Sequence, residues 1–400
     1  MTSKQRSILV LALVTQGLSV GLTYGIFPVF LVPLETLFDA PRTQIAAGQI
    51  LIMTALTAGS ISAGAVLDKG YARNVLLGGA LLLSGSLALA SVAPNLIVLA
   101  IAAIGMGFAV PSVGPLAGAT LITRNFDAER GRAMGLMSMG PPMGSGLLAA
   151  LAGWTVISYG VRTSFLIFAV LAAVVMVPLI AWIVPARFPQ KAEDSDEPAL
   201  AMGDVIRMPV FWWTASVFAL GAGVSTGWTV HIAAFFGESG LDETQRAGLL
   251  AAVFWMGVPG ALFFGYLSDR VSLERLYTFM LGGQAVGYLL FSMVLPPAAV
   301  VAVGIALGFM TGGMIPLFLV FLGKRMGPEA FGRAMGLSNL LMLPVMAVSV
   351  VIAARFFEAQ GNYVGALRIF AVMVLFAIVC VFGSKRSAEA SALAKGTEAV

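Results

Sequence analysis

The sequence predicts an all-α membrane protein in which twelve transmembrane helices form two pseudo-symmetric six-helix bundles. Hydrophobic residues make up 59% of the 400 residues and charged residues only 10%, whereas soluble domains carry about 25% charged residues. Apolar runs of the roughly 20 residues that a helix needs to cross a bilayer occur repeatedly along the chain. The second half also repeats motifs of the first half at one constant spacing, which indicates a duplication.

The repeat is clearest in the motif Gly-Arg-Ala-Met-Gly-Leu, which occupies residues 131–136 and again residues 332–337, an offset of 201 residues. So many matches at one offset indicate two halves of common design. The same offset relates Gly64 to Gly265, Asp68 to Asp269, Gly107 to Gly308, Pro115 to Pro316 and Arg124 to Arg325.

All of the apolar runs are predicted to be helices, because barrel strands would give short alternating segments instead. The first run follows Lys4 and Arg6 and is longer than the apolar core of a signal peptide, about 7 to 15 residues, so we expect a retained span. The twelve predicted spans are residues 8–34, 44–67, 74–92, 96–121, 132–158, 162–184, 210–236, 247–267, 276–295, 298–322, 334–356 and 364–383.

Four segments follow from these spans. Residues 1–184 are predicted to form the first six-helix bundle and residues 209–385 the second, with a polar cytoplasmic linker at 185–208 and a cytoplasmic tail at 386–400. If the N-terminus is cytoplasmic, 18 of the 23 Lys and Arg residues lie inside. The positive-inside rule therefore places both termini in the cytoplasm.

Composition also argues against several classes of function. One cysteine, Cys380, excludes a disulfide framework, and one histidine, His231, excludes a histidine-cluster metal site. The net charge of +4 reflects the loop bias rather than nucleic-acid binding. Neither a phosphate-binding Gly-x-x-x-x-Gly-Lys loop nor a catalytic constellation occurs. We expect no enzyme activity, no cofactor and no metal, and a monomer in the lipid bilayer whose partner is a small-molecule solute.

Two carboxylates at equivalent positions are candidates for a cytoplasmic gate. Asp68 and Asp269 each end a span, and each can cap the positive end of a helix for about 0.3 to 1 kcal/mol. A crossed arrangement would join Asp68 to the helix of Arg333 and Asp269 to that of Arg132, with Arg73 beside it. The alternative interpretation is ordinary loop charge.

Glycine and proline are dense at residues 140–146, Gly-Pro-Pro-Met-Gly-Ser-Gly. In a membrane, small residues let helices approach closely, and neighbours re-satisfy the carbonyls that proline frees. The simpler interpretation is tight packing with a kink. The other is a helix that lines a central cavity and bends as the cavity opens and closes.

The twelve spans in two similar halves, the loop at residues 64–73 and the Gly-Pro run resemble the major facilitator superfamily over nearly the whole chain. This resemblance implies a secondary transporter in which two bundles rock about a site near the membrane midplane. Ala72 stands where the family usually has arginine, so the gate is expected to be weaker in this half.

Three stretches resemble the branch of monocarboxylate transporters and oxalate/formate antiporters: residues 24–27 through Phe38 and Arg42, residues 124–126 with 130–133, and residues 160–165. This second resemblance implies transport of a small organic acid across a bacterial inner membrane. The branch usually places an arginine inside span eight, and Ala261 occupies that position here. The family's carboxylate-binding cation is therefore missing.

The candidate solute contacts are polar or aromatic residues inside the spans. Intramembrane ionisable groups are costly and tend to be functional. His231, with an unperturbed pKa near 6.5, could carry a proton or pair with an anion; the alternative is a neutral histidine bonded near the outer interface. The predicted solute contacts are Tyr24, Ser112, Trp228, His231, Trp255 and Asn339.

Two other functions remain open from the sequence. Export of apolar compounds or antibiotics is favoured by the methionine-rich, charge-free spans and by the Gly-Pro run. A membrane sensor that does not transport belongs to a different class, and it would normally need an appended signalling domain.

Overall fold

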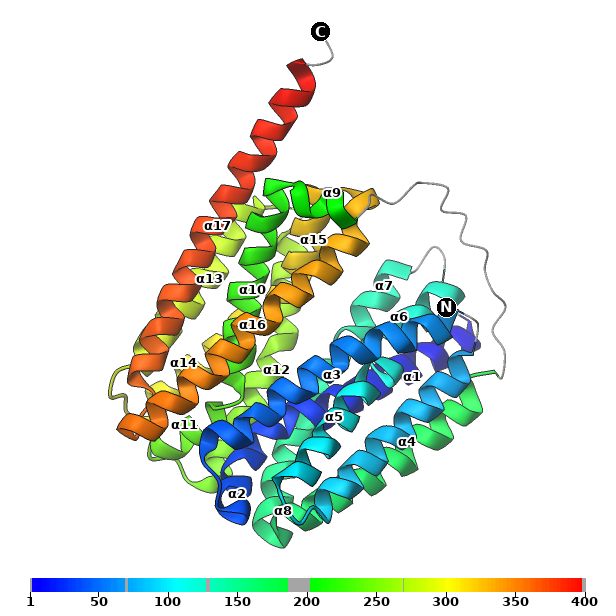
Figure 1. Ribbon diagram of the computed structural model, residues 1–400, viewed down its shortest axis with the longest axis vertical. Helices are drawn as coiled ribbons and strands as arrows, with labels where there is room; N and C mark the ends of the chain where they lie inside the picture. Colours follow the sequence, from blue (N-terminus) through cyan, green and yellow to red (C-terminus); the bar gives the residue numbers. More distant parts are fainter. Residues whose placement is uncertain (1, 69–70, 127–129, 186–201, 269, 398–400) are drawn as a thin grey trace. The chain divides into compact units, whose positions relative to one another are not determined.

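The computed structural model describes residues 2–68, 71–126, 130–185, 202–268 and 270–397. These residues form a chain of helices (Figure 1), and most of the predicted linker, residues 186–201, lies outside them. The first half contains α1 Ser3–Val20, the π-helix η1 Gly21–Gly25, α2 Phe27–Phe38, α3 Arg42–Asp68, α4 Ala72–Ser91, α5 Leu96–Val113, α6 Pro115–Asn125, α7 Arg130–Met137 and α8 Gly140–Ile183. The second half contains α9 Met202–Arg207, α10 Pro209–Thr229, α11 Ile232–Glu238, α12 Glu243–Leu267, α13 Leu273–Phe291, α14 Pro297–Gly312, α15 Met314–Met326, α16 Pro328–Gln360 and α17 Val364–Thr397.

Helix starts follow local capping chemistry. Thr2 and Gln5 form a reciprocal capping box that opens α1. The carboxylate of Asp242 accepts the backbone N–H of Gln245 at 2.8 Å, and the Gln245 side chain accepts that of Asp242 at 3.1 Å, so α12 begins in the same way. In both cases the side chains satisfy amide groups that the first helical turn leaves unpaired.

The predicted duplication extends to the helix boundaries. At the offset of 201 residues, α3 corresponds to α12, α4 to α13, α5 to α14 and α6 to α15. Gly160 interrupts α8 with φ of 79°, and its equivalent Gly361 ends α16 with φ of 69°. Glycine adopts this left-handed region without strain, so each half turns from its fifth to its sixth span at the same glycine.

Each of the twelve predicted spans contains a helix. By length and hydropathy, nine candidate spans are found among the described residues, or ten if the bent pair α10 and α11 is one span. One of the nine, Ala133–Ile183, crosses the Gly160 break and so covers two predicted spans, and α13 falls below the hydropathy criterion. The last helix, α17, runs on from span twelve through most of the predicted tail, to Thr397.

The chain divides into two compact units. The first contains residues 1–193 together with 232–255, and the second contains residues 194–231 and 256–400. The first unit therefore takes in α11 and the first half of α12, which the predicted boundary at residue 209 assigned to the second bundle. α10 belongs to the second unit and α11 to the first, so the chain passes from one unit to the other within predicted span seven.

Corresponding helices cross at corresponding glycines in the two units. In the first unit α3 packs against α5, and a β-carbon on Gly59 would lie 3.0 Å from Phe108 Cα. In the second unit a β-carbon on Gly260 of α12 would lie 3.2 Å from Phe309 Cα of α14. Close backbone approach at small residues is how membrane helices gain packing contacts. Figure 1 shows α3, α4 and α5 side by side, and α10, α16 and α17 in the second unit.

Candidate functional site

Span one packs on span five along a seam of glycines. A β-carbon on Gly21 would lie 2.7 Å from the carbonyl oxygen of Gly144, and one on Gly25 would lie 2.7 Å from Ser145 Cα. A β-carbon on Gly17 would lie 2.9 Å from the carbonyl oxygen of Gly140. The Gly-Pro run thus brings α8 against α1 and η1 backbone to backbone, as its small residues predicted. The asymmetry of Lys and Arg along the sequence assigns one end of each bundle to the cytoplasm. We call that end the inner end and the opposite end the outer end.

Tyr24 lies in η1, where the wider π-helical turn replaces one turn of span one. Its hydroxyl group contacts the Met53 sulfur of α3 at 2.7 Å. A thioether is a weak hydrogen-bond acceptor, so the phenol has capacity for a stronger partner. π-Helical turns of this kind occur frequently at functional sites.

Gln49 lies one helical turn from Met53 on the same face of α3. Its side chain is only 2% exposed, and within the described part of the chain neither its amide oxygen nor its amide nitrogen has a hydrogen-bond partner. An unsatisfied buried polar group costs about 1 to 3 kcal/mol. Such a group calls for an explanation, and a bound solute or water is one.

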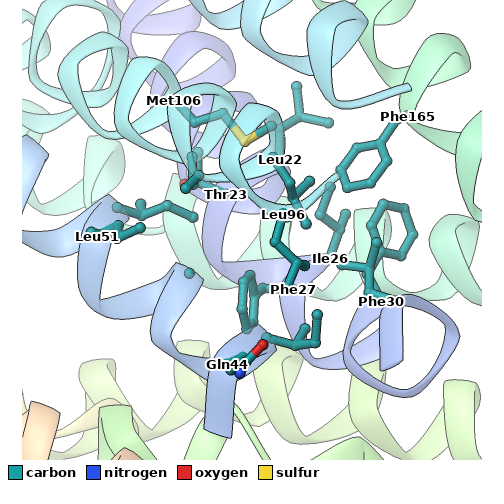
Figure 2. Close-up of a pocket in the computed structure, with 17 residues that line it drawn as sticks. Leu22, Thr23, Ile26, Phe27, Phe30, Gln44, Leu51, Leu96, Met106 and Phe165 are labelled. Carbon is teal, nitrogen blue, oxygen red and sulfur yellow. The ribbon is translucent and has the colours of Figure 1, made fainter. Parts of the chain in front are cut away.

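A cavity of about 70 Å³ lies in the first unit between span one, α3, α5 and Phe165 of α8 (Figure 2). This volume holds about five water molecules. Its wall is apolar except for Thr23 and Gln44, and the Thr23 hydroxyl group donates to the Ser19 carbonyl of its own helix at 2.7 Å. Figure 2 shows Phe27, Phe30 and Met106 around the cavity.

Ser112 and Trp255 lie on other surfaces of the first unit. Ser112 lines a shallow groove with Asn74 and Gly79 of α4, where a β-carbon on Gly79 would lie 2.5 Å from Ser112 Cβ. Trp255 lies against Gly146, whose added β-carbon would be 2.7 Å from the indole Nε1 atom, and 43% of the Trp255 side chain is exposed. The glycine provides the space in which the indole packs.

An ion cluster joins α2, α3 and α11 at the outer end of the first unit. The Arg42 Nε and Nη2 atoms donate to the two Glu35 carboxylate oxygens at 2.6 and 3.0 Å, and Nη1 lies 3.8 Å from the Glu238 carboxylate. Arg42 is 7% exposed and is the only buried Lys, Arg, Asp or Glu among the described residues. The bidentate geometry with Glu35 compensates the buried charge.

Trp228 and His231 lie together in the second unit. The Trp228 ring packs within 6.5 Å, centroid to centroid, of Tyr288, Tyr363 and Phe370. The His231 Nε2 atom lies 3.0 Å from the backbone carbonyl oxygen of Val350, at the bend that follows α10. A carbonyl only accepts hydrogen bonds, so this nitrogen is the donor. His231 is fully buried, and its ring centroid is 5.6 Å from that of Tyr363.

Asn339 lies in α16 of the second unit and is partly buried. The neighbouring Ser338 hydroxyl group donates to the Ala334 carbonyl oxygen of the same helix at 2.7 Å. The six predicted solute contacts therefore divide equally, with Tyr24, Ser112 and Trp255 in the first unit. Trp228, His231 and Asn339 lie in the second unit.

The predicted gate falls partly outside the described residues. Asp269 and the side chains of Asp68 and Arg132 lie there, whereas Arg73 is in the first turn of α4 and Arg333 is in α16. The crossed latch therefore stays a prediction. The described inner-end ion pair joins other residues of the second unit, because the Arg325 Nη2 atom donates to the Glu274 carboxylate at 2.6 Å.

Three features were missed by the sequence reasoning: the unpaired Gln49 amide, the outer ion cluster and the Glu274–Arg325 pair. Arg325 was noticed only as the repeat of Arg124, although the repeat also places Glu274 opposite Arg73. An arginine in the first half is thus replaced by a glutamate in the second half. This change of charge was the available signal for an ion pair in the second half. No group of three or more His, Cys, Asp or Glu side chains that could hold a metal ion is found among the described residues.

Comparisons with known proteins agree on the type of protein. Residues 10–350 and 244–399 match the family described as "Major Facilitator Superfamily". The chain is 24% identical to monocarboxylate transporter 13 of Bos taurus over 354 residues, covering 86% of this chain and 81% of that protein, and 23% identical to that of Rattus norvegicus over the same shares.

Among solved structures, the chain resembles a bacterial homolog of the human lysosomal transporter Spinster. The TM-score is 0.74 at 15% identity for the inward-facing, occupied form and 0.75 at 13% identity for the unoccupied form. Each alignment covers 97% of this chain and 98% of the other. At these identities the likeness concerns the fold, and it confirms the predicted helical architecture.

Proposed function

This chain belongs to the major facilitator superfamily and is therefore a secondary transporter rather than an enzyme, and we propose that its solute is a monocarboxylate or similar small organic acid. The main support is the distant similarity to monocarboxylate transporter 13 over most of both chains. The motifs at residues 24–27, 124–133 and 160–165 favour the same branch.

The cavity beside span one supports a small solute. Room for about five water molecules suits an acid of a few non-hydrogen atoms, whereas drug-sized ligands occupy pockets of about 300 to 1,000 Å³. The rival function, export of apolar compounds, is favoured by the apolar wall of the same cavity. The two functions therefore predict different solutes for one protein.

Several finer assignments belong to this proposal. The transporter works in a bacterial inner membrane with both termini in the cytoplasm. His231 exchanges the coupled proton or contacts the anion, and Asp68, Arg73, Arg132, Asp269 and Arg333 form the cytoplasmic gate. Trp255, held against Gly146 with much of its indole exposed, contacts the solute.

Uptake of labelled lactate and formate into proteoliposomes, with and without a pH gradient, tests the proposed function. We expect saturable uptake that protein-free liposomes lack. Trp255→Ala should lower the uptake rate about tenfold or more. Trp182→Ala is the matched control, because that indole is 88% exposed, and it should leave uptake unchanged.

If no acid is taken up while expression raises resistance to hydrophobic drugs, apolar export replaces acid transport. Equal uptake by the two tryptophan variants would remove Trp255 from the solute site. Neither outcome depends on the direction of transport in the cell, because both solute classes are tested with the same purified protein.

A further inference from the structure

Gln49 is the buried polar group of the first unit whose hydrogen-bonding capacity is left entirely unused. Its amide oxygen and nitrogen both lack partners within the described residues. Gln16 of α1 is also buried, but of its two amide atoms only the oxygen is both closed to solvent and without a partner in the described part of the chain. The group complementary to Gln49 must therefore offer one donor and one acceptor together.

The surroundings of Gln49 place a polar end beside an apolar space. Gln49 does not itself line the cavity, but Ile45 and Ile52, which precede and follow it on the same side of α3, both do. Met53, one turn further along, contacts the Tyr24 hydroxyl group at 2.7 Å. Within the described residues the phenol has only this thioether as a hydrogen-bond partner, so it can donate to a better acceptor.

Few charges lie near this part of the chain. α5, which packs along α3, carries no titratable side chain, and Glu35 is the only charged residue of α2. Glu35 is held by Arg42, seven residues and about 10 Å along α3 from Gln49. Glu238 is the charged residue of α11, and Asp242 lies just before α12 begins. Arg73 lies in the first turn of α4, at its inner end. Of the cations on these elements, Arg42 is shared by Glu35 and Glu238, Arg246 donates to the Leu241 carbonyl oxygen, and Arg73 lies at the other end of its helix. None of these cations hydrogen-bonds to the Gln49 amide within the described residues.

We propose that Gln49 and Tyr24 bind the carboxyl group of the solute in its undissociated form, with the apolar chain of the acid in the adjoining cavity. This inference rests on the proposed function and names the form of the solute and the residues that recognise it. The Gln49 nitrogen donates to the carbonyl oxygen of the acid, its oxygen accepts the acid O–H, and the Tyr24 hydroxyl group adds a second donor.

The chemistry favours the neutral acid over the carboxylate. A carboxylate only accepts hydrogen bonds, so it would leave the Gln49 oxygen facing negative charge. An undissociated acid satisfies both atoms of the amide and carries no charge into the membrane interior. Each solute then brings one proton with it, which removes the need for the span-eight arginine that Ala261 replaces.

The amide has no access to solvent in this structure. Solute therefore reaches Gln49 in another conformation, as alternating access provides. A primary amide of the same carbon chain presents the same donor and acceptor as the undissociated acid. It is therefore expected to bind at the same place, and its binding does not vary with pH.

Uptake of labelled propionate by proteoliposomes from pH 5 to pH 7 tests this inference. We expect a KM that is constant when expressed as undissociated acid and that rises about tenfold per pH unit when expressed as total acid. Propionamide should compete. Gln49→Met keeps the length of the side chain and removes both hydrogen bonds, so it should raise KM about 10- to 100-fold and abolish that competition. Tyr24→Phe should raise KM about fivefold.

Gln16→Met is the matched control, because it removes another buried glutamine of the same bundle and should leave KM unchanged. Direct binding of labelled propionate to the purified protein separates the two levels of the proposal. Suppose that the wild type binds propionate without transporting it and that Gln49→Met no longer binds it. That result would refute acid transport but would support the binding site at Gln49. A KM constant in total acid, or equal KM values for wild type and Gln49→Met, would overturn the inference.

Discussion

The glycine seam between spans one and five gives the strongest prediction about stability. A β-carbon on Gly144 would lie 2.6 Å from Gly17 Cα, whereas ordinary contacts of this kind are 3.4 to 4 Å. Both sides of the contact are backbone, so no side chain can rotate away. Gly144→Ala must separate α8 from α1 by about 1 Å, at a cost of about 1 to 3 kcal/mol.

Gly85→Ala is the control, because nothing lies within 4 Å of its added β-carbon in the middle of α4. Replacing glycine with alanine in a helix gains about 0.5 to 1 kcal/mol where space allows. The two variants should therefore differ by about 1.5 to 4 kcal/mol, which corresponds to several degrees in apparent Tm.

The single cysteine of the sequence provides the assay. Cys380 is buried, so a thiol-reactive dye reports its exposure as the detergent-solubilised protein unfolds. At one scan rate, Gly144→Ala should unfold several degrees below wild type, and Gly85→Ala at or above it. If Gly144→Ala and Gly85→Ala unfold at the same temperature, the helices are not in backbone contact at this seam and the packing argument fails.

Two further predictions concern charged and titratable groups. Glu35→Gln leaves the buried Arg42 without its bidentate partner and should destabilise the protein by about 3 kcal/mol in the same assay. The control is Glu389→Gln, at an exposed pair with Lys385, which should change the stability by less than about 1 kcal/mol. Equal effects would show that the outer cluster contributes no more than a surface ion pair. His231→Gln preserves a donor for the Val350 carbonyl and removes the titratable ring, so unfolding and downhill exchange should stay near wild type. Gradient-driven accumulation is lost if His231 carries the coupled proton. It is retained if the proton travels on the undissociated acid, and that result would exclude His231 from coupling.

The duplication could be predicted from the sequence because identical residues recur in the two halves at a fixed spacing. The offset that relates residues 131–136 to 332–337 also relates the helix boundaries and the turns at Gly160 and Gly361. Long apolar runs determine transmembrane helices because the bilayer interior leaves the backbone no other way to satisfy its hydrogen bonds. Fold class was therefore accessible from sequence alone.

The site was less accessible, because each of its features depends on which residues meet across the bundle. Nothing in the sequence around Gln49 distinguishes its amide, which has no partner among the described residues, from that of Gln284, whose oxygen accepts a hydrogen bond from Ser225. Burial of Arg42 depends on Glu35 and Glu238, which lie on two other helices.

The sequence by itself determined that this protein is a duplicated, helical membrane transporter, because periodicity, length and hydropathy act along the chain. The tertiary structure decided that the Tyr24 hydroxyl group contacts a methionine sulfur, that Gln49 is buried without a partner among the residues the structure describes, and that His231 donates to a backbone carbonyl. Hydrogen bonds require atoms within about 3 Å, and only the packed helices bring residues far apart in the chain to that distance.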